Sequence, residues 1–238
     1  MSGGPGRRRR GLVIAIDGPS GAGKSTAGRA LADRLGYTFL DTGAMYRALA
    51  LKALRAGVPL DLEQPLAQLA HEARIEQSPE RRVLLDGEDV TDAIRTPEVS
   101  AASSRISTHA RVRREMAARQ REMGKDGGVV LDGRDIGTAV FPDAEVKFYV
   151  DADPRRRAER RQRELTAAGA ELDVDTIELA IRARDEADST RQQSPLVRAP
   201  DAIHIDTTEL DPKEVVERMA AEVRRAASRT PPPLRGRG

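Results

Sequence analysis

The stretch Gly18-Pro19-Ser20-Gly21-Ala22-Gly23-Lys24-Ser25-Thr26 matches the phosphate-loop pattern G-x-x-x-x-G-K-[ST] at every fixed position. Residues 12–17, a short run rich in β-branched side chains, precede it and predict a buried strand. Residues 25–35 follow it and predict a helix with one apolar face. Strand, glycine-rich loop and helix in this order are the setting that the pattern requires. The sequence therefore predicts a nucleoside triphosphate site.

Each residue type in this loop has a physical role in holding phosphate. The glycines let the backbone turn several N–H groups inward, and the helix that begins near Lys24 adds the positive end of its dipole. The Lys24 side chain can reach the β- and γ-phosphates, and the Ser25 hydroxyl can bind a magnesium ion. We therefore expect residues 18–26 to bind ATP, with Lys24 as a catalytic residue and Ser25 as a metal ligand.

The composition bounds the class of protein. A chain of 238 residues is long enough for one domain that carries an insertion. The net charge of +2 is too balanced for a general nucleic-acid-binding protein. The basic residues are 35 arginines and only five lysines. Because guanidinium groups grip phosphates bidentately, some of these arginines are candidates for a phosphate site.

Several residue types are absent or scattered. The chain has no cysteine, which excludes disulfides, thiolate metal sites and a cysteine nucleophile. No apolar run approaches the roughly 18 residues of a membrane span, and the basic first ten residues lead into a strand instead of an apolar signal segment. We therefore expect a cytoplasmic protein with no membrane partner. His71, His109 and His204 lie far apart in the sequence, and we interpret them as structural.

Strands and helices alternate along most of the chain. Beyond the loop, short apolar runs predict strands over residues 37–40, 129–132, 146–150 and 202–206. Longer periodic stretches predict helices over residues 44–55, 111–123, 154–168, 173–187 and 212–226. Such alternation indicates a parallel sheet that is covered by helices on both faces. The predicted fold class is α/β, with five core strands and the phosphate loop after the first.

The pattern changes between residues 58 and 105. A predicted helix over residues 62–73 is followed by two short predicted strands, at 74–77 and 82–85, with turns at 78–80 and 86–88. This mixture of a helix, short strands and turns predicts a small α+β insertion. The chain ends, residues 1–10 and 229–238, are rich in glycine, arginine or proline and predict a disordered basic arm and a disordered tail.

Three separated clusters of polar residues lie at the ends of predicted elements. They are Asp41-Thr42-Gly43-Ala44-Met45-Tyr46-Arg47, Asp132-Gly133-Arg134-Asp135-Ile136-Gly137-Thr138 and Arg184-Asp185-Glu186-Ala187-Asp188-Ser189-Thr190-Arg191. No Asn/Thr-Lys-x-Asp segment is present, which argues against a guanine-specific switch.

Arginines in these clusters point to a second phosphate site. Arg47, Arg134 and Arg191 come from distant segments and could converge on the phosphate of an acceptor, where they would neutralise charge that repels ATP. The alternative for any one of them is a solvated surface charge. Asp132, at the end of a strand, is a candidate to hold magnesium through a water molecule, or else a turn residue.

At these residues the chain closely resembles the bacterial cytidylate kinases (CMP kinases), which belong to the nucleoside monophosphate kinase group of P-loop proteins. The resemblance runs over about residues 11–225. The segments that carry it are residues 16–24, the turn Thr42-Gly43-Ala44-Met45-Tyr46-Arg47, the stretch Ile94-Arg95-Thr96-Pro97-Glu98-Val99, and residues 132–142. Only the basic arm and the proline-rich tail depart from the family.

The resemblance implies the P-loop NTPase fold and its division into regions. The kinase domain would span residues 11–228, with a core made of residues 11–41, 124–153 and 188–228. Residues 42–123 would form the monophosphate-binding region, with the insertion at about 58–105. Residues 154–187 would form the lid that closes over ATP.

The resemblance also assigns residues to CMP. Ser104, Arg113 and Asp135 match residues that read the cytosine ring, and Arg184 and Asp188 match residues that hold the ribose. The full set expected to bind CMP is Thr42, Arg47, Ser104, Arg113, Arg134, Asp135, Arg184, Asp188 and Arg191, of which Arg134 and Arg191 would also be catalytic. In the lid, Arg157, Arg160 and Arg161 are expected to contact ATP, whereas Arg156, Arg160 and Arg163 share one helical face. Some arginines of that helix are expected to be ordinary solvated charges.

The resemblance thus implies magnesium-assisted phosphorylation of CMP and dCMP by ATP, giving CDP and dCDP in pyrimidine nucleotide metabolism. One alternative is the same fold acting on another small acceptor, such as UMP or shikimate. A more distant alternative is a non-catalytic, RNA-associated nucleotide-binding protein, although three Tyr, three Phe and no Trp leave few side chains for stacking on bases. We expect a monomer that binds small-molecule substrates and no nucleic acid.

Overall fold

The structure is a computed structural model that describes residues 11–78, 80–167 and 169–229. Its elements, in chain order, are β1 (Val13–Asp17), α1 (Lys24–Leu35), β2 (Thr38–Asp41), α2 (Thr42–Arg55), α3 (Glu63–Glu72), β3 (Ile75–Gln77), β4 (Val83–Leu85), β5 (Glu88–Asp89), the 3₁₀ helix η1 (Ala93–Arg95), α4 (Pro97–Ile106), α5 (Ala110–Gly124), β6 (Val129–Gly133), the π-helix η2 (Ile136–Val140), β7 (Val146–Asp151), α6 (Pro154–Ala167), α7 (Val174–Thr190), β8 (Ile203–Asp206) and α8 (Pro212–Arg229).

The central sheet has five parallel strands in the order β2-β6-β1-β7-β8, which confirms the predicted α/β fold with the phosphate loop after the first strand. In the register, Asp17 of β1 lies opposite Gly133 of β6, and Asp41 of β2 lies opposite Asp132 of β6. The carboxyl ends of three strands therefore meet at one edge. In an open parallel sheet, ligands bind at that edge.

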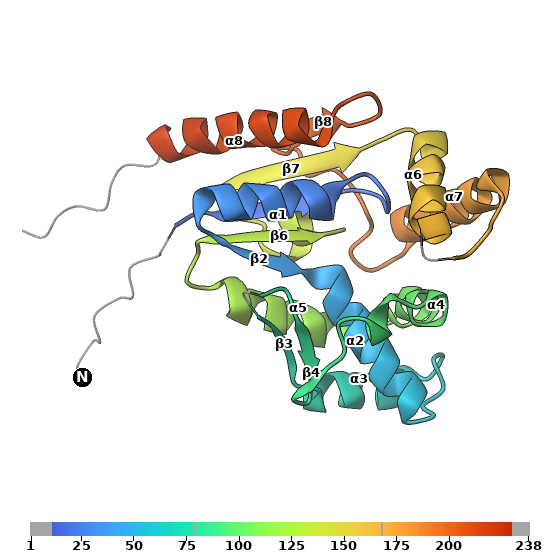
Figure 1. Cartoon of the computed structure of the whole chain (residues 1–238). Coiled ribbons are helices and arrows are strands. Elements are labelled where there is room, and N and C mark those ends of the chain that lie inside the picture. The colour runs from blue at the N-terminus through green and yellow to red at the C-terminus, as the bar shows by residue number, and fades with distance from the viewer. Residues whose placement is uncertain (1–10, 79, 168, 230–238) are drawn as a thin grey trace, which may run out of the picture.

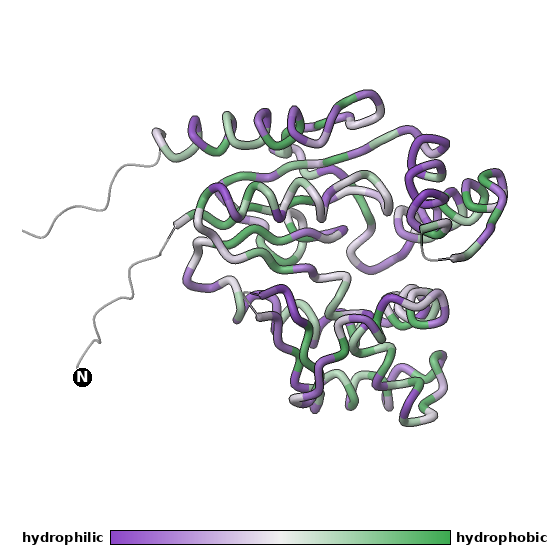
Figure 2. Tube along the Cα trace, in the orientation of Figure 1, coloured by the Kyte–Doolittle hydropathy of each residue, from purple (hydrophilic) through white to green (hydrophobic). Residues whose placement is uncertain are grey.

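Both faces of the sheet are covered, as the alternation of elements predicts. Ile14 and Ile16 of β1 pack with α1 and α8 on one face, where Leu31 and Met219 are fully buried. Val13 and Ala15, the alternate residues of β1, pack with η2 and α5 on the other face. Figure 2 shows the strands of the central sheet as mostly hydrophobic and helix α6 as mostly hydrophilic. Alternate residues of a strand point to opposite faces, so an apolar run such as β1 belongs to a sheet that is buried on both sides.

The monophosphate-binding region expected from the sequence has its own core beneath the sheet, built from α2–α5 and a three-stranded antiparallel sheet in the order β3-β4-β5 (Figure 1). Residues 58–105 contain α3, β3, β4, β5, η1 and most of α4, and the division of the chain into core, insertion and lid stays a prediction. Strand β5 begins at Glu88, inside a stretch predicted as a turn, and helix α4 was not predicted. Helix α4 nevertheless has a strong start, because the Thr96 hydroxyl accepts from Val99 N at 3.2 Å and Pro97 occupies the first turn.

Helices α6 and α7 form a hairpin beside the carboxyl ends of the sheet strands (Figure 1). Helix α7 runs to Thr190, three residues beyond its predicted end, and so carries Asp188 within the helix. Helix α8 runs to Arg229, also three residues beyond prediction. The predicted basic arm, residues 1–10, and all of the predicted tail except Arg229 lie outside the described residues. Within the described ranges, no helix combines the length and apolar character needed to cross a membrane.

Candidate active site

A cavity of about 230 Å³ opens at the carboxyl edge of the sheet. The phosphate loop and the end of β6 form its sheet side, the start of α2 and parts of α4 and α5 form a second side, and the last turns of α7 form a third. Six basic side chains and four aspartates line it. This cavity is the candidate active site, and its charge suits a phosphorylated ligand.

Two of the glycines in the phosphate loop, Gly18 and Gly23, are needed for different reasons. Gly18 has a φ of +144°, and a Cβ there would lie 1.9 Å from the carbonyl oxygen of Val150. Gly23 has a φ of +86° and directly precedes helix α1. A side chain would clash at the first position and would be strained at the second. The two glycines therefore let the loop pass close to β7 and turn into the helix that presents its N-terminus to phosphate.

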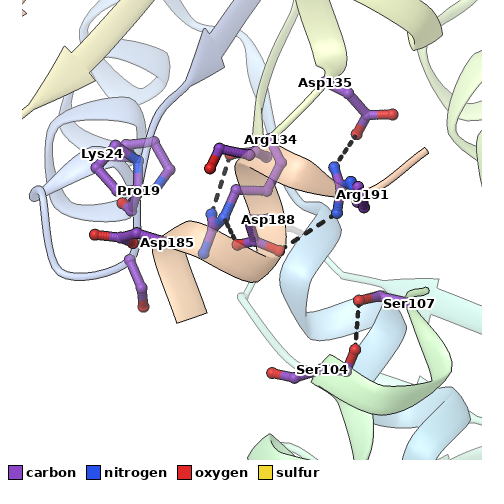
Figure 3. Close-up of polar contacts among 12 residues, drawn as sticks. Pro19, Lys24, Ser104, Ser107, Arg134, Asp135, Asp185, Asp188 and Arg191 are labelled. Carbon is purple, nitrogen blue, oxygen red and sulfur yellow. Dashed lines mark hydrogen bonds and ion pairs between the residues drawn. The ribbon is translucent and has the colours of Figure 1, made fainter. Parts of the chain in front are cut away.

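Lys24 is buried beneath the loop. Its Nζ donates to the carbonyl oxygen of Pro19 at 2.7 Å (Figure 3). Burial is the main cause that lowers the pKa of Lys24, and the nearby Arg134 guanidinium adds to the effect. A bound phosphate chain would oppose both effects, because its negative charge favours the protonated amine.

Ser25 and Asp132 form the candidate metal site. The Ser25 hydroxyl donates to Oδ2 of Asp132. Burial, and next the neighbouring Asp41 carboxylate, raise the pKa of Asp132, so this position favours an added positive charge. Among the described residues no three His, Cys, Asp or Glu side chains gather into a metal cluster. Magnesium in phosphate-binding enzymes commonly takes one or two protein oxygens plus substrate phosphates and water, so the Ser25–Asp132 pair fits it.

Arginines converge opposite the loop. Arg134 Nε donates to Asp188 Oδ2 at 3.0 Å, and Arg191 NH1 donates to Asp188 Oδ1 at 3.4 Å (Figure 3). The buried Nε atoms of Arg113 and Arg184 and the buried NH2 of Arg191 have no hydrogen-bond partner. Buried donors without partners are costly in a folded protein, so such a group is evidence for a ligand that accepts from them. Burial lowers the pKa of Arg184 to about 10, with Arg134 as the next cause.

A second buried pair lies farther along the cavity. Arg113 NH2 donates to Oδ2 of Asp135 at 2.5 Å, and the Arg113 guanidinium lies 5.9 Å from the ring centroid of Tyr46. Burial raises the pKa of Tyr46 to about 12. Both members of the Arg113–Asp135 pair are less than 10% exposed. A carboxylate acceptor and several donors at fixed positions in a pocket can recognise the edge of a base by hydrogen bonding.

The Asp17 carboxylate binds the backbone directly after Asp135. Its Oδ1 and Oδ2 accept from the backbone N–H groups of Ile136 at 2.8 Å and Gly137 at 2.7 Å. Burial raises the pKa of Asp17 to about 6, although the two N–H groups oppose the rise. The last residue of β1 thus fixes the start of η2, directly after Asp135.

A second cavity, of about 470 Å³, lies on the other side of the phosphate loop. It is lined by Ala22, Gly23 and Thr26 of the loop, by the segment between β8 and α8, and by three arginines on one face of α6, Arg156, Arg160 and Arg163. The two cavities share Gly23 and Thr26. A phosphate chain lying on the loop would therefore have one cavity at each end.

Comparisons with known proteins give the family of this chain. The family model described as cytidylate kinase matches residues 14–225. The chain belongs to the cytidylate kinase family. A cytidylate kinase from Geobacter sulfurreducens is 51% identical over 226 residues, which is 94% of this chain and 97% of that protein. One from Syntrophotalea carbinolica is 53% identical over 213 residues, covering 88% of this chain and 91% of its own length.

Solved structures give more distant likenesses. A shikimate kinase from Acinetobacter baumannii in complex with shikimate aligns with a TM-score of 0.47 and 18% identity, covering 94% of this chain and 97% of that one. A shikimate kinase from Bacteroides thetaiotaomicron aligns with a TM-score of 0.48 and 14% identity, covering 90% of this chain and 98% of that one. The strand order of the sheet, rather than these likenesses, defines the fold here.

Most residues that the sequence singled out for CMP in this cytidylate kinase family member lie together. Those that line the first cavity are Thr42, Arg47, Arg113, Arg134, Asp135, Arg184, Asp188 and Arg191. Ser104 does not line it, and its hydroxyl donates to the carbonyl oxygen of Ser100 at 3.2 Å. Ser103 and Ser107, one position before and three after it, do line the cavity. A contact of Ser104 with the base stays a prediction.

The residues expected to bind ATP divide between the two cavities. Ser20, Gly21, Gly23, Lys24, Ser25 and Thr26 line the first, and Ala22 and Arg160 line the second. Gly18 and Pro19 are the first residues of the loop and lie below the part that lines the cavities, where they set the path of the backbone. Arg157 is buried against the loop, with NH1 donating to Ser20 O at 3.2 Å and NH2 lying 2.7 Å from Asp185 Oδ2. Arg161 is exposed, pairs with Glu164 and lines neither cavity.

Seven residues that line the first cavity were given no role from the sequence: Asp41, Gly43, Tyr46, Ser103, Ser107, Gln120 and Gly133. Asp41, Gly43 and Gly133 lie in the polar clusters singled out above, and two of the others had a sequence cue. Tyr46 adjoins Arg47 in the Thr-Gly-Ala-Met-Tyr-Arg turn, and Gln120 follows Arg113 by seven residues, which places both on one face of α5. The two serines depend on helix α4, which was not predicted.

Proposed function

We propose that this protein transfers the γ-phosphoryl group of ATP to CMP and to dCMP, giving ADP and CDP or dCDP. The observation that carries the proposal is the composition of the first cavity. It joins an intact phosphate loop to a cluster of arginines with unpartnered donors and to the buried Arg113–Asp135 pair. Membership of the cytidylate kinase family supports the same activity.

In this proposal the acceptor lies in the first cavity. Its phosphate binds Arg47, Arg134 and Arg191, and Thr42 lies at the start of the same turn. Its base lies against Asp135 and Arg113, with Ser104 as the third proposed contact. Its ribose is held by Arg184 and Asp188. The unpartnered donors of Arg113, Arg184 and Arg191 support this arrangement, because the ligand would supply their acceptors.

The donor lies across the loop. The phosphate chain of ATP would rest on the backbone N–H groups of residues 18–26, with Lys24 near the β- and γ-phosphates. The nucleoside of ATP would lie toward the second cavity, with Arg160 beside it. Arg157 and Arg161 are proposed to reach ATP when the lid closes. Closure of residues 154–187 over the core would exclude water and prevent wasteful hydrolysis.

The chemistry requires positioning and charge stabilisation. A phosphate oxygen of CMP attacks the γ-phosphorus of ATP, and the bond from that phosphorus to the β,γ-bridging oxygen breaks and releases ADP. The attacking oxygen is already an anion at neutral pH, so no strong general base is needed. Lys24, Arg134 and Arg191 neutralise negative charge around the transferred group. Magnesium, when bound, would be held by Ser25 and, through water, by Asp132, and would neutralise negative charge on the phosphates of ATP.

A coupled assay of ADP release tests the proposal. Purified protein with ATP and magnesium is offered CMP, dCMP, UMP, AMP, GMP or shikimate in separate reactions. We expect rapid turnover with CMP and dCMP and little with the others, because the proposed base contacts of Asp135 and Arg113 match the hydrogen-bonding edge of cytosine. Turnover with shikimate or UMP alone would favour the other small acceptors. ATP binding without turnover on any acceptor would favour the RNA-associated nucleotide-binding alternative. Monomeric state, cytoplasmic location and the absence of a nucleic acid partner stay predictions.

Arginine geometry at the acceptor phosphate gives a further prediction. Replacing Arg134 or Arg191 with lysine is expected to lower kcat/KM for CMP by at least about tenfold, because an ammonium group cannot reproduce a bidentate guanidinium contact. Each arginine also forms an ion pair with Asp188, and we expect the lysine substitution to weaken that ion pair as well. Arg105→Lys, at an exposed arginine that pairs with Asp61, is the matched control. Wild-type kinetics in both site variants would mean that neither guanidinium contacts the acceptor.

A further inference from the structure

The side chain of Gln77, the last residue of β3, is paired with the backbone of the central sheet. Asp41 N donates to Gln77 Oε1 at 2.9 Å, and Gln77 Nε2 donates to the carbonyl oxygen of Asp41 at 2.7 Å. Both bonds have good geometry and join residues 36 positions apart. A carboxamide has the same donor and acceptor as a peptide group, so Gln77 acts here as one added peptide unit of a neighbouring strand.

The position of this contact in the sheet is informative. Strand β2 lies at the edge of the central sheet, paired on one side with β6, and Asp41 is its last residue. The outer N–H and C=O of an edge strand need a partner or water. Gln77 satisfies both groups of Asp41, so the small sheet of the insertion is fastened to the core sheet at the carboxyl edge where the cavity opens.

Asp41 in turn organises the start of α2. Its Oδ1 accepts from Ala44 N at 2.8 Å and so caps the helix. Its Oδ2 lies 3.3 Å from Arg47 NH2 and 3.3 Å from Arg29 NH2. The Arg47 guanidinium also lies over Gly43, where a Cβ would come within 3.1 Å of its NH1. The direction of Arg47 therefore depends on where the backbone of Asp41 is held.

We propose that Gln77 is a positioning residue for the acceptor phosphate: through Asp41 it fixes the capped start of α2 and hence the direction of Arg47. The inference rests on the proposed function, since it assigns Arg47 to the phosphate of CMP. It gives the three-stranded sheet of the insertion a role in substrate binding, although none of its residues lines the first cavity. Lys24, on the donor side, is held by a different contact, the hydrogen bond from its Nζ to the carbonyl oxygen of Pro19.

Steady-state kinetics of Gln77→Met and Gln77→Glu test the inference. Methionine keeps the size of the side chain and removes both hydrogen bonds, whereas glutamate removes the donor and sets a carboxylate against the carbonyl oxygen of Asp41. We expect KM for CMP to rise by about tenfold in both variants, because methionine removes both part-buried hydrogen bonds and glutamate replaces one of them with a repulsive contact. KM for ATP and kcat are expected to stay within about twofold of wild type, a split that general destabilisation would not produce.

Arg81→Ala is the matched control. Arg81 lies in the same hairpin and bridges the insertion to the core through Asp33 of α1 at 2.6 Å, without contacting Asp41. Its KM for CMP is expected to be unchanged. Thermal unfolding of each variant checks that the protein assayed is folded.

A double variant separates action through Arg47 from a direct effect. If Gln77 acts through Arg47, Gln77→Met is expected to add less than about twofold to KM for CMP in an Arg47→Ala background. The inference is overturned if both Gln77 variants keep the wild-type KM for CMP, if KM for ATP rises equally, or if Arg81→Ala has the same effect. An inactive wild-type enzyme with CMP would instead overturn the proposed function.

Discussion

Lys24→Ala is expected to lower kcat for CMP phosphorylation by about a hundredfold or more, which corresponds to about 3 kcal/mol of lost transition-state stabilisation. The Nζ of Lys24 donates to the neutral carbonyl oxygen of Pro19, and the carboxylates of Asp132 and Asp17 contribute attractive charge nearby. Its positive charge acts at full strength only when phosphate lies against it. We therefore expect removal of the charge to change the free energy of unfolding only slightly and to lower kcat strongly.

The measurement is kcat in the coupled ADP-release assay, with far-UV circular dichroism and thermal unfolding as checks of the fold. Lys52→Ala is the matched control, since Lys52 lies on α2, pairs with Asp86 and lines neither cavity. The control is expected to keep wild-type kcat. A folded Lys24→Ala protein with near-normal turnover would contradict the role of Lys24 on the transferred phosphoryl group.

The parts of this molecule that sequence reasoning located are those governed by local rules. The phosphate loop is defined by glycine positions and by its neighbours on both sides, and β1 is recognisable because an apolar run of β-branched residues suits a strand that is buried on both faces. The arginine-bearing clusters were found because each follows a strand or ends a helix. Parallel strands bring such ends to one edge, so their convergence could be anticipated without coordinates.

The parts that sequence reasoning missed depend on tertiary contacts. The π-helix η2 starts where the Asp17 carboxylate accepts two backbone N–H groups from 119 and 120 residues away. The sequence does not distinguish Gln77 from other polar residues, because its role depends on the hydrogen bonds between its side-chain amide and the backbone at the edge of β2. Helix α4 is rich in serine, which weakens the periodic pattern, and its Thr96-Pro97 start was the overlooked cue. The face shared by Arg156, Arg160 and Arg163 was predicted by spacing, but the inward turn of Arg157 toward Ser20 was not.

The preference for CMP over UMP is the second prediction with a large expected effect. Cytosine carries an amino donor at its 4-position, whereas uracil carries a carbonyl acceptor there. The Asp135 carboxylate can only accept hydrogen bonds when ionised, and it faces the Arg113 guanidinium at 2.5 Å and the Arg191 guanidinium at 4.0 Å. It should bind the amino group of cytosine and repel the carbonyl of uracil. We expect wild-type kcat/KM for CMP to exceed that for UMP by at least about a hundredfold, because mismatched buried polar groups are costly.

Asp135→Asn is expected to lose activity with CMP and to narrow the ratio of CMP to UMP by at least about tenfold. The amide oxygen should stay on Arg113 NH2, since two donors would repel, and the amide NH₂ would then face the cavity and donate to the uracil carbonyl. Asp143→Asn, at an exposed aspartate outside both cavities, is the control and should keep the wild-type ratio. The measurement is kcat/KM for each nucleotide in wild type and both variants. If wild type uses UMP as well as CMP, or if Asp135→Asn leaves the ratio unchanged, Asp135 is not the carboxylate that reads the base.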